Sequence, residues 1–115
     1  MKIERQLLKG TAPIAVLSLL AERPMYGYEI SKELIQRSKE LLSLGHGSLY
    51  PLLYNLEAKG HVQAKEECAE NGRPRRYYHI TQSGTKHLTQ QRQHWEQLQQ
   101  GMHNLLQSSP QELHS

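Results

Sequence analysis

Phenylalanine is absent from this chain of 115 residues, and tryptophan and cysteine occur once each. Without phenylalanine, aliphatic side chains must form most of the hydrophobic core. The single cysteine, Cys68, excludes an intramolecular disulfide, which is typical of proteins from a reducing cytoplasm. No apolar run is long enough to span a bilayer. A chain of this length has room for one domain with one modest core.

The first residues have some features of a secretory signal peptide, because three cations precede the apolar segment 12–21. Pro13 and Ser18 interrupt that segment, and no cleavage site of the small-x-small type follows it. The helical periodicity also continues beyond the segment. We therefore expect a cytoplasmic protein that does not bind membranes.

The charged and histidine residues narrow the possible functions. Lysine and arginine outnumber aspartate and glutamate by 14 to 11, and this mild positive charge suits a polyanionic partner. No combination of nucleophile, base and orienting residue occurs, nor any glycine-rich phosphate loop, so we expect neither an enzyme nor a cofactor. His87 and His94 are two helical turns apart, roughly 10 Å, which is too far to share one metal ion. We expect no metal site.

Residues 45–60, GHGSLYPLLYNLEAKG, have the pattern of one short amphipathic helix between two glycines. Its buried stripe follows the spacing i, i+3, i+4, i+7 and comprises Leu49, Leu52, Leu53 and Leu56. Ser48 is the expected N-cap, Pro51 fits the first turn, and Gly60 is the expected end. The opposite face has no acidic residue and comprises Pro51, Tyr54, Asn55 and Ala58, with Tyr50 on its flank. This face is suited to contact with a partner.

The amino-terminal part is predicted to contain two separate segments. Residues 1–9 form a short helix or arm whose apolar side, with Ile3 and Leu7, needs a partner elsewhere. A core helix then begins at the N-cap Thr11, has Pro13 in its first turn, and ends near residue 22.

A further helix is predicted over residues 26–38, with Ile30 and Leu34 turned inward. Gly27 lies early in this helix, where glycine is less stable than alanine. We therefore expect another segment to pack closely against Gly27.

After Gly60 the apolar period changes from 3.6 to 2, which is typical of strands. The two predicted strands, residues 61–67 and 75–80, are separated by Asn71-Gly72, a hairpin signal. Three helices followed by a hairpin predict a winged helix-turn-helix fold, mainly α (α+β). The distal half of the hairpin, residues 71–81, has no acid and carries Arg73, Arg75 and Arg76. This favours phosphate contact over a merely solvated surface.

A long last helix, residues 81–107, is predicted to begin at the N-cap Thr81. Its apolar positions recur every seven residues and comprise Leu88, Trp95 and Met102, with Leu98 and Leu105 in a second series. At roughly 39 Å this helix is too long for so small a domain to cover. We therefore predict a dimerisation helix after a winged-helix domain in residues 1–80, and a tail in residues 108–115.

Three motifs, in this order, resemble the PadR family of bacterial transcriptional regulators: YGYEI (26–30), GSLYPLLYNLEAKG (47–60) and GRPRRYYHITQSG (72–84). The resemblance covers most of residues 7–88 and is to the smaller branch, with a single C-terminal helix. It implies a DNA-binding winged helix, a homodimer held by the last helix with help from the first, and usually repression. Some members of this branch stack flat aromatic compounds between subunits on a tryptophan at the position of Trp95. Packing in the helix seam is the alternative role of Trp95.

The family often has a basic pair such as His-Arg where this chain has Tyr54-Asn55, so its recognition helix is less cationic. We predict a dimer that binds an inverted-repeat site in duplex DNA. The residues expected at the DNA are Tyr26, Lys32, Ser48, Tyr50, Tyr54, Asn55, Lys59, Arg73, Arg75 and Arg76. Those expected at the dimer interface are Ile3, Leu7, Leu88, Trp95, Leu98, Met102 and Leu105.

Two other interpretations compete with this one. A winged helix can bind only protein, and the arginine hairpin argues against that interpretation. A regulator can also respond to a metal ion or to oxidation, here of Cys68, which lies near the hairpin turn.

Overall fold

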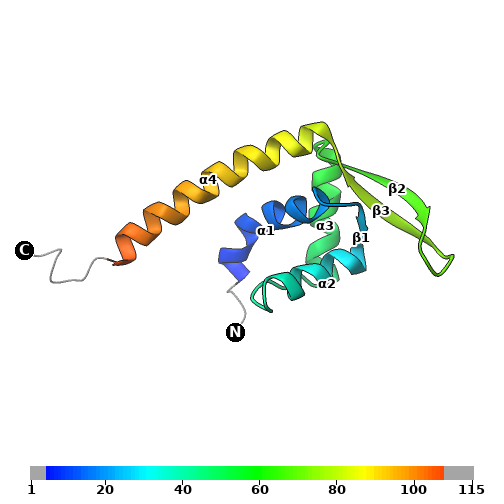
Figure 1. The fold of residues 1–115 in the computed structure, drawn as a ribbon, viewed down its shortest axis with the longest axis horizontal. Coiled ribbons are helices and arrows are strands. Elements are labelled where there is room, and N and C mark those ends of the chain that lie inside the picture. Colours follow the sequence, from blue (N-terminus) through cyan, green and yellow to red (C-terminus); the bar gives the residue numbers. More distant parts are fainter. Residues whose placement is uncertain (1–4, 108–115) are drawn as a thin grey trace, which may run out of the picture.

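The computed structural model describes residues 5–107, so Ile3 and the tail 108–115 lie outside the described part. The elements are α1 (Arg5–Leu20), β1 (Met25–Tyr26), α2 (Gly27–Arg37), α3 (His46–Ala58), β2 (Val62–Cys68), β3 (Pro74–Ile80) and α4 (Gln82–Gln107) (Figure 1). The fold is mainly helical with a small antiparallel sheet and a long C-terminal helix. The prediction of a winged helix is confirmed.

One continuous helix, α1, replaces the arm and the separate helix that the sequence predicts. Thr11 is not an N-cap, because it lies inside α1 and its hydroxyl donates to the carbonyl of Leu8 at 3.1 Å. Pro13 also lies inside α1, where it removes one backbone hydrogen bond. The buried positions Leu8, Ala12 and Val16 continue across this segment at a spacing of four residues. Burial of this stripe offsets a proline cost of about 3 kcal/mol.

Aliphatic side chains fill the core, as the lack of phenylalanine predicts. Helices α1, α2 and α3 and the inner face of the sheet enclose it. Ile30 and Leu34 of α2 point into the core, which confirms their predicted orientation. The largest fully buried side chains are Leu17, Leu20, Met25, Ile30, Leu49, Leu53 and Val16.

The sheet has the strand order β1-β3-β2, and both pairings are antiparallel. The sequence does not predict β1, because two residues are too few to show an alternating pattern. Val62 pairs with Ile80 and Ala64 with Tyr78, which puts the apolar positions on the inner face. The turn follows the Asn71-Gly72 prediction, with φ +82° at Gly72. We call the β2–β3 hairpin the wing.

The last helix begins at its predicted cap and then leaves the domain. The Thr81 hydroxyl accepts a hydrogen bond from the amide of Gly84 at 3.0 Å, and α4 ends at Gln107. Leu88 is buried against the domain, whereas the second half of α4 extends past the rest of the molecule (Figure 1). Within residues 5–107, no helix has the length and apolar character needed to cross a bilayer.

Candidate nucleic-acid interface

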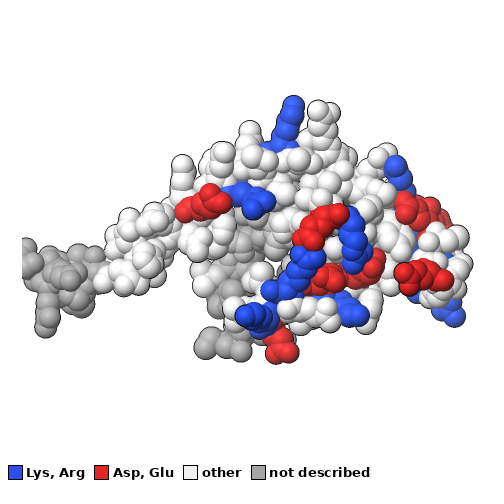
Figure 2. Space-filling model, in the orientation of Figure 1, with Lys and Arg blue, Asp and Glu red and all other residues white. Residues whose placement is uncertain are grey.

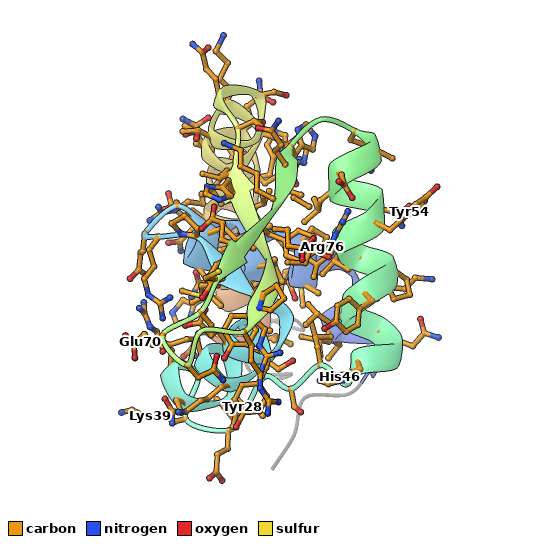
Figure 3. The ribbon with its side chains drawn as sticks, turned by 90° about the vertical axis from the view of Figure 1, so that its right-hand side faces the viewer. Tyr28, Lys39, His46, Tyr54, Glu70 and Arg76 are labelled. Atoms are coloured by element: carbon orange, nitrogen blue, oxygen red, sulfur yellow. The ribbon has the colours of Figure 1, made fainter. Side chains whose placement is uncertain are left out.

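Helix α3 presents the outer face that the sequence predicts. Leu49, Leu53 and Leu56 are buried, and Leu52 is half-buried. The opposite side is exposed and comprises Pro51, Tyr54, Asn55 and Ala58. Tyr54 is 72% exposed and points away from the body of the protein (Figure 3). The leucine stripe thus fixes the helix to the core and leaves an acid-free polar face free for a partner.

The start of α3 differs from the prediction. Gly45 is the N-cap, with extended backbone angles, and its carbonyl accepts hydrogen bonds from the amides of Ser48 and Leu49. Ser48 lies in the first turn and is exposed. Glycine also caps helices well, so a helix that begins at His46 needs no serine cap. The Ser48 hydroxyl therefore remains on the surface beside the outer face.

Tyr50, on the flank of α3, contacts the start of α2. A Cβ added at Gly27 would overlap the Tyr50 hydroxyl, so this position accepts only glycine unless the tyrosine moves. The close packing predicted at Gly27 is confirmed. The Tyr50 ring also makes an edge-on contact with His46, with 5.6 Å between ring centroids. These contacts connect the start of α2 with the outer face of α3.

An aromatic cluster covers the outer face of the sheet, opposite the core. The Tyr26 ring meets Tyr77 edge-on, with 5.4 Å between centroids, and stacks with Tyr28 at 6.5 Å. The guanidinium of Arg75 lies over the Tyr26 ring at 5.5 Å, and its Nε is buried with no hydrogen-bond partner among the described residues. Tyr26 and Arg75, both expected at the DNA, are therefore half-buried against each other.

The three wing arginines have different surroundings. Arg76 forms an ion pair with Glu57 of α3, with 3.2 Å between Nη2 and Oε2. Arg75 is stacked on Tyr26 as described above. Arg73 lies in the exposed turn, where its amide donates to Asn71, and it forms no ion pair within residues 5–107. Among the three, Arg73 is the one whose guanidinium is free for a partner.

The opposite strand makes the wing less cationic than residues 71–81 alone indicate. The register brings Glu66 opposite Arg76 and Glu67 opposite Arg75. Glu67 also lies 2.7 Å from the Nε2 of His79, and both acidic and basic side chains are visible at the wing (Figure 2). The acid-free segment 71–81 therefore faces the glutamates of β2, which lower the net positive charge of the wing.

The two lysines expected at the DNA lie on different helices. Lys32 is exposed on α2, and Lys59 is exposed at the C-cap of α3. Nearby, the rings of His61 and His87 stack with 4.3 Å between centroids, and His61 Nδ1 lies 3.1 Å from the Ser83 hydroxyl. The sequence does not reveal this histidine pair. No group of three or more metal-ligating side chains occurs within the described part of the chain.

The second half of α4 carries apolar side chains that its own domain leaves uncovered. Trp95 is 41% exposed and Leu105 70%, and the other exposed apolar side chains are Leu98, Met102 and Leu106. Leu7 of α1 is exposed as well. Leu88, expected at a dimer interface, instead belongs to the domain core, because the first turns of α4 pack on the domain.

Two hollows border α1 and α4. One has a volume of about 390 Å³ and is lined by Thr11, Ile14, Ala15, Ser38, Leu41, Leu42 and Trp95. We call it the Trp95 hollow. The other, about 730 Å³, lies between α1, α3 and α4. Apolar residues such as Leu8 and Leu52 line much of it, and Ser48, Asn55 and Lys59, expected at the DNA, also border it. No titratable side chain lines the Trp95 hollow within residues 5–107.

Comparisons with known proteins identify the family. The model of the transcriptional regulator PadR-like family matches residues 16–90. A PadR-like regulator from Bacillus cereus is 31% identical, with a TM-score of 0.81 over 90% of this chain and 99% of that one. A regulator from Clostridium thermocellum is also 31% identical, with a TM-score of 0.80 over 89% and 96%. The transcriptional regulator Rv3488 of Mycobacterium tuberculosis is 31% identical over 94 residues, 82% of this chain and 84% of its own length. The chain belongs to the PadR-like family of transcriptional regulators.

Proposed function

We propose that this regulator binds duplex DNA selectively, with α3 as the recognition helix in the major groove. The outer face of α3 carries this proposal, because it is exposed, free of acidic residues and backed by buried leucines. Asn55 has the amide geometry that pairs with adenine, and the exposed hydroxyls of Tyr54 and Ser48 would contact bases or phosphates. Arg73 on the wing contributes a phosphate contact, and Tyr50 and Lys32 contribute contacts with the sugar-phosphate backbone of the DNA.

We propose that the active form is a homodimer. The exposed apolar side chains of α4 support this, because one domain leaves them uncovered in water. The seven-residue repeat is typical of a helix that packs on another helix. The exposed Leu7 of α1 would join the contact. Two-fold symmetry then requires an inverted repeat with half-sites about one helical turn, or a multiple, apart.

The family resemblance favours repression, released by a small planar aromatic compound. The Trp95 hollow supports such a ligand, because a half-exposed indole ring borders an apolar space. A ligand between two copies would change the angle between the two recognition helices and thereby the affinity for DNA. Quenching of the single tryptophan by planar aromatic compounds tests this part of the proposal, and no quenching by a broad panel would contradict it.

Fluorescence anisotropy with labelled duplexes from the chain's own locus tests DNA binding. We expect two copies per site and an affinity that falls steeply with salt. Arg73→Gln should weaken binding to all sequences and lower the salt dependence. Lys86→Gln is the matched control, since Lys86 is an exposed cation on the first turns of α4, away from the wing turn. A protein that ignores these duplexes at low salt would contradict the proposal and favour a role in binding protein alone.

A further inference from the structure

An ion pair joins the wing to α3. Arg76 on β3 donates from Nη2 to both carboxylate oxygens of Glu57, at 3.2 and 3.3 Å, across 19 residues of sequence. The Arg76 side chain reaches from the wing toward α3 (Figure 3). Its guanidinium also lies over the ring of Tyr78, 5.9 Å from the centroid, and Tyr78 is buried in the core. Arg76 therefore contacts both of the elements that must meet the DNA together.

Arg76 faces an acidic residue across the sheet and does not form an ion pair with it. The register puts Glu66 directly opposite Arg76 on β2, yet Arg76 forms its ion pair with Glu57. Tyr78 first, and the charge of Glu57 second, raise the pKa of Arg76 above its usual value. The arginine at the wing turn, Arg73, has no comparable partner within residues 5–107. Arg76 is thus oriented toward its own recognition helix, while Arg73 is oriented toward solvent.

We propose that Arg76 is a positioning residue that braces the wing against α3, and that it does not contact DNA itself. This inference rests on the proposed DNA binding and assigns a different role to one of the residues expected at the DNA. A projecting hairpin that meets phosphates must be held at a fixed angle to the helix in the groove. The brace restricts that angle before binding, so less conformational freedom is lost when the complex forms.

Removing either partner of the brace distinguishes the two roles of Arg76. As a brace, Arg76→Gln and Glu57→Gln should each weaken DNA binding by up to about fivefold, the upper end for an exposed ion pair. The double variant should be no weaker than the poorer single variant, because both changes remove the same contact. The salt dependence should stay that of the unmodified protein in all three variants. Arg73→Gln should instead reduce the slope of log binding constant against log salt concentration by about one unit per wing.

A phosphate contact by Arg76 predicts the opposite result for Glu57→Gln. That change would free the guanidinium for a phosphate, so binding would tighten. Arg76→Gln would then lower the salt dependence in the way that Arg73→Gln does. Either result would contradict the proposal that Arg76 positions the wing.

The single cysteine allows a measurement that needs no DNA. Cys68 is exposed at the end of β2, opposite Pro74, so a nitroxide label on its thiol reports motion of the wing. We expect Arg76→Gln and Glu57→Gln to increase the mobility of the label, and Arg73→Gln to leave it unchanged. Unchanged mobility in all three variants overturns the brace. A failure to bind DNA contradicts the proposed function and leaves this measurement intact, so the two failures are distinguishable.

Discussion

Gly84, in the first turn of α4, lies against the backbone carbonyl of His61 so closely that no side chain fits there. Thr81 completes this junction, because its hydroxyl donates to the carbonyl of Gly60 at 2.6 Å and its amide donates to that of His61 at 3.0 Å. The start of α4 is therefore fixed to the turn that follows α3. A displacement of α4 relative to the domain would therefore be passed to the end of α3.

Gly84→Ala should lower the free energy of unfolding by about 1–3 kcal/mol, the usual cost of overpacking a site that cannot relax. The neighbouring atom is a backbone carbonyl, so it cannot rotate away. Chemical denaturation measures the change. Gly101→Ala is the control, because Gly101 also lies in α4 but has open space around its Cα. That variant should gain about 0.5–1 kcal/mol from helix propensity, and a loss as large as that of Gly84→Ala would refute the account.

Gly27→Ala should cost less stability than Gly84→Ala but should weaken DNA binding. The added methyl overlaps the hydroxyl of Tyr50, which is the far end of a half-exposed side chain and can move. Movement of Tyr50 would disturb the outer face of α3. Denaturation curves and anisotropy titrations separate the two effects. Gly27→Ala/Tyr50→Phe should recover part of the stability loss, since the hydroxyl is gone, and no recovery would contradict the contact.

The sequence predicts those features that depend on neighbours in the chain. The periods of 3.6 and 2 correctly assign the inner and outer faces of α3 and the wing, and the Asn71-Gly72 turn lies where expected. Local rules fail at Thr11 and Pro13, because buried side chains keep α1 continuous through a proline. The N-cap rule also fails at Ser48, because Gly45 caps a helix that begins two residues earlier, at His46.

The pairings that define the candidate site could not be predicted, because they join distant segments. Arg76 and Glu57 meet only when the wing packs beside α3, and the stacking of His61 on His87 requires α4 to pack back on the domain. The cluster of Tyr26, Tyr77 and Arg75 depends on β1, which is too short to leave a pattern in the sequence. Counting arginines in residues 71–81 therefore overestimates the cations available to a partner.

Asn55→Ala should reduce discrimination between sequences more than it reduces overall affinity. A bidentate amide contact with a base contributes about 1–3 kcal/mol of discrimination, whereas contacts with phosphates do not depend on sequence. Competition titrations with the best duplex and with a scrambled duplex measure this ratio. Lys32→Ala is the comparison, since an exposed lysine on α2 should weaken binding to both duplexes equally. If Asn55→Ala weakens binding to both duplexes equally, Asn55 contacts the DNA backbone and not a base.

The junction of α4 should lose stability in acid through His61. Burial first, and then the positive charges of His87 and Lys59, lower the pKa of His61 below its usual value of 6.5. The unfolded chain therefore takes up a proton near pH 6.5 while the folded junction resists it, so this stabilisation is present above pH 6.5 and is lost as the pH falls toward the pKa of the folded state. Thermal unfolding from pH 7.5 to 5.5 measures the loss.

His61→Gln should reduce this dependence on pH, because glutamine can still form a hydrogen bond with Ser83 but does not titrate. His94→Gln, at an exposed position of α4, is the matched control and should keep the full dependence. If His61→Gln shows the same decrease in melting temperature as the unmodified chain, the acid sensitivity arises elsewhere. The stacked pair would then stabilise the junction by packing alone.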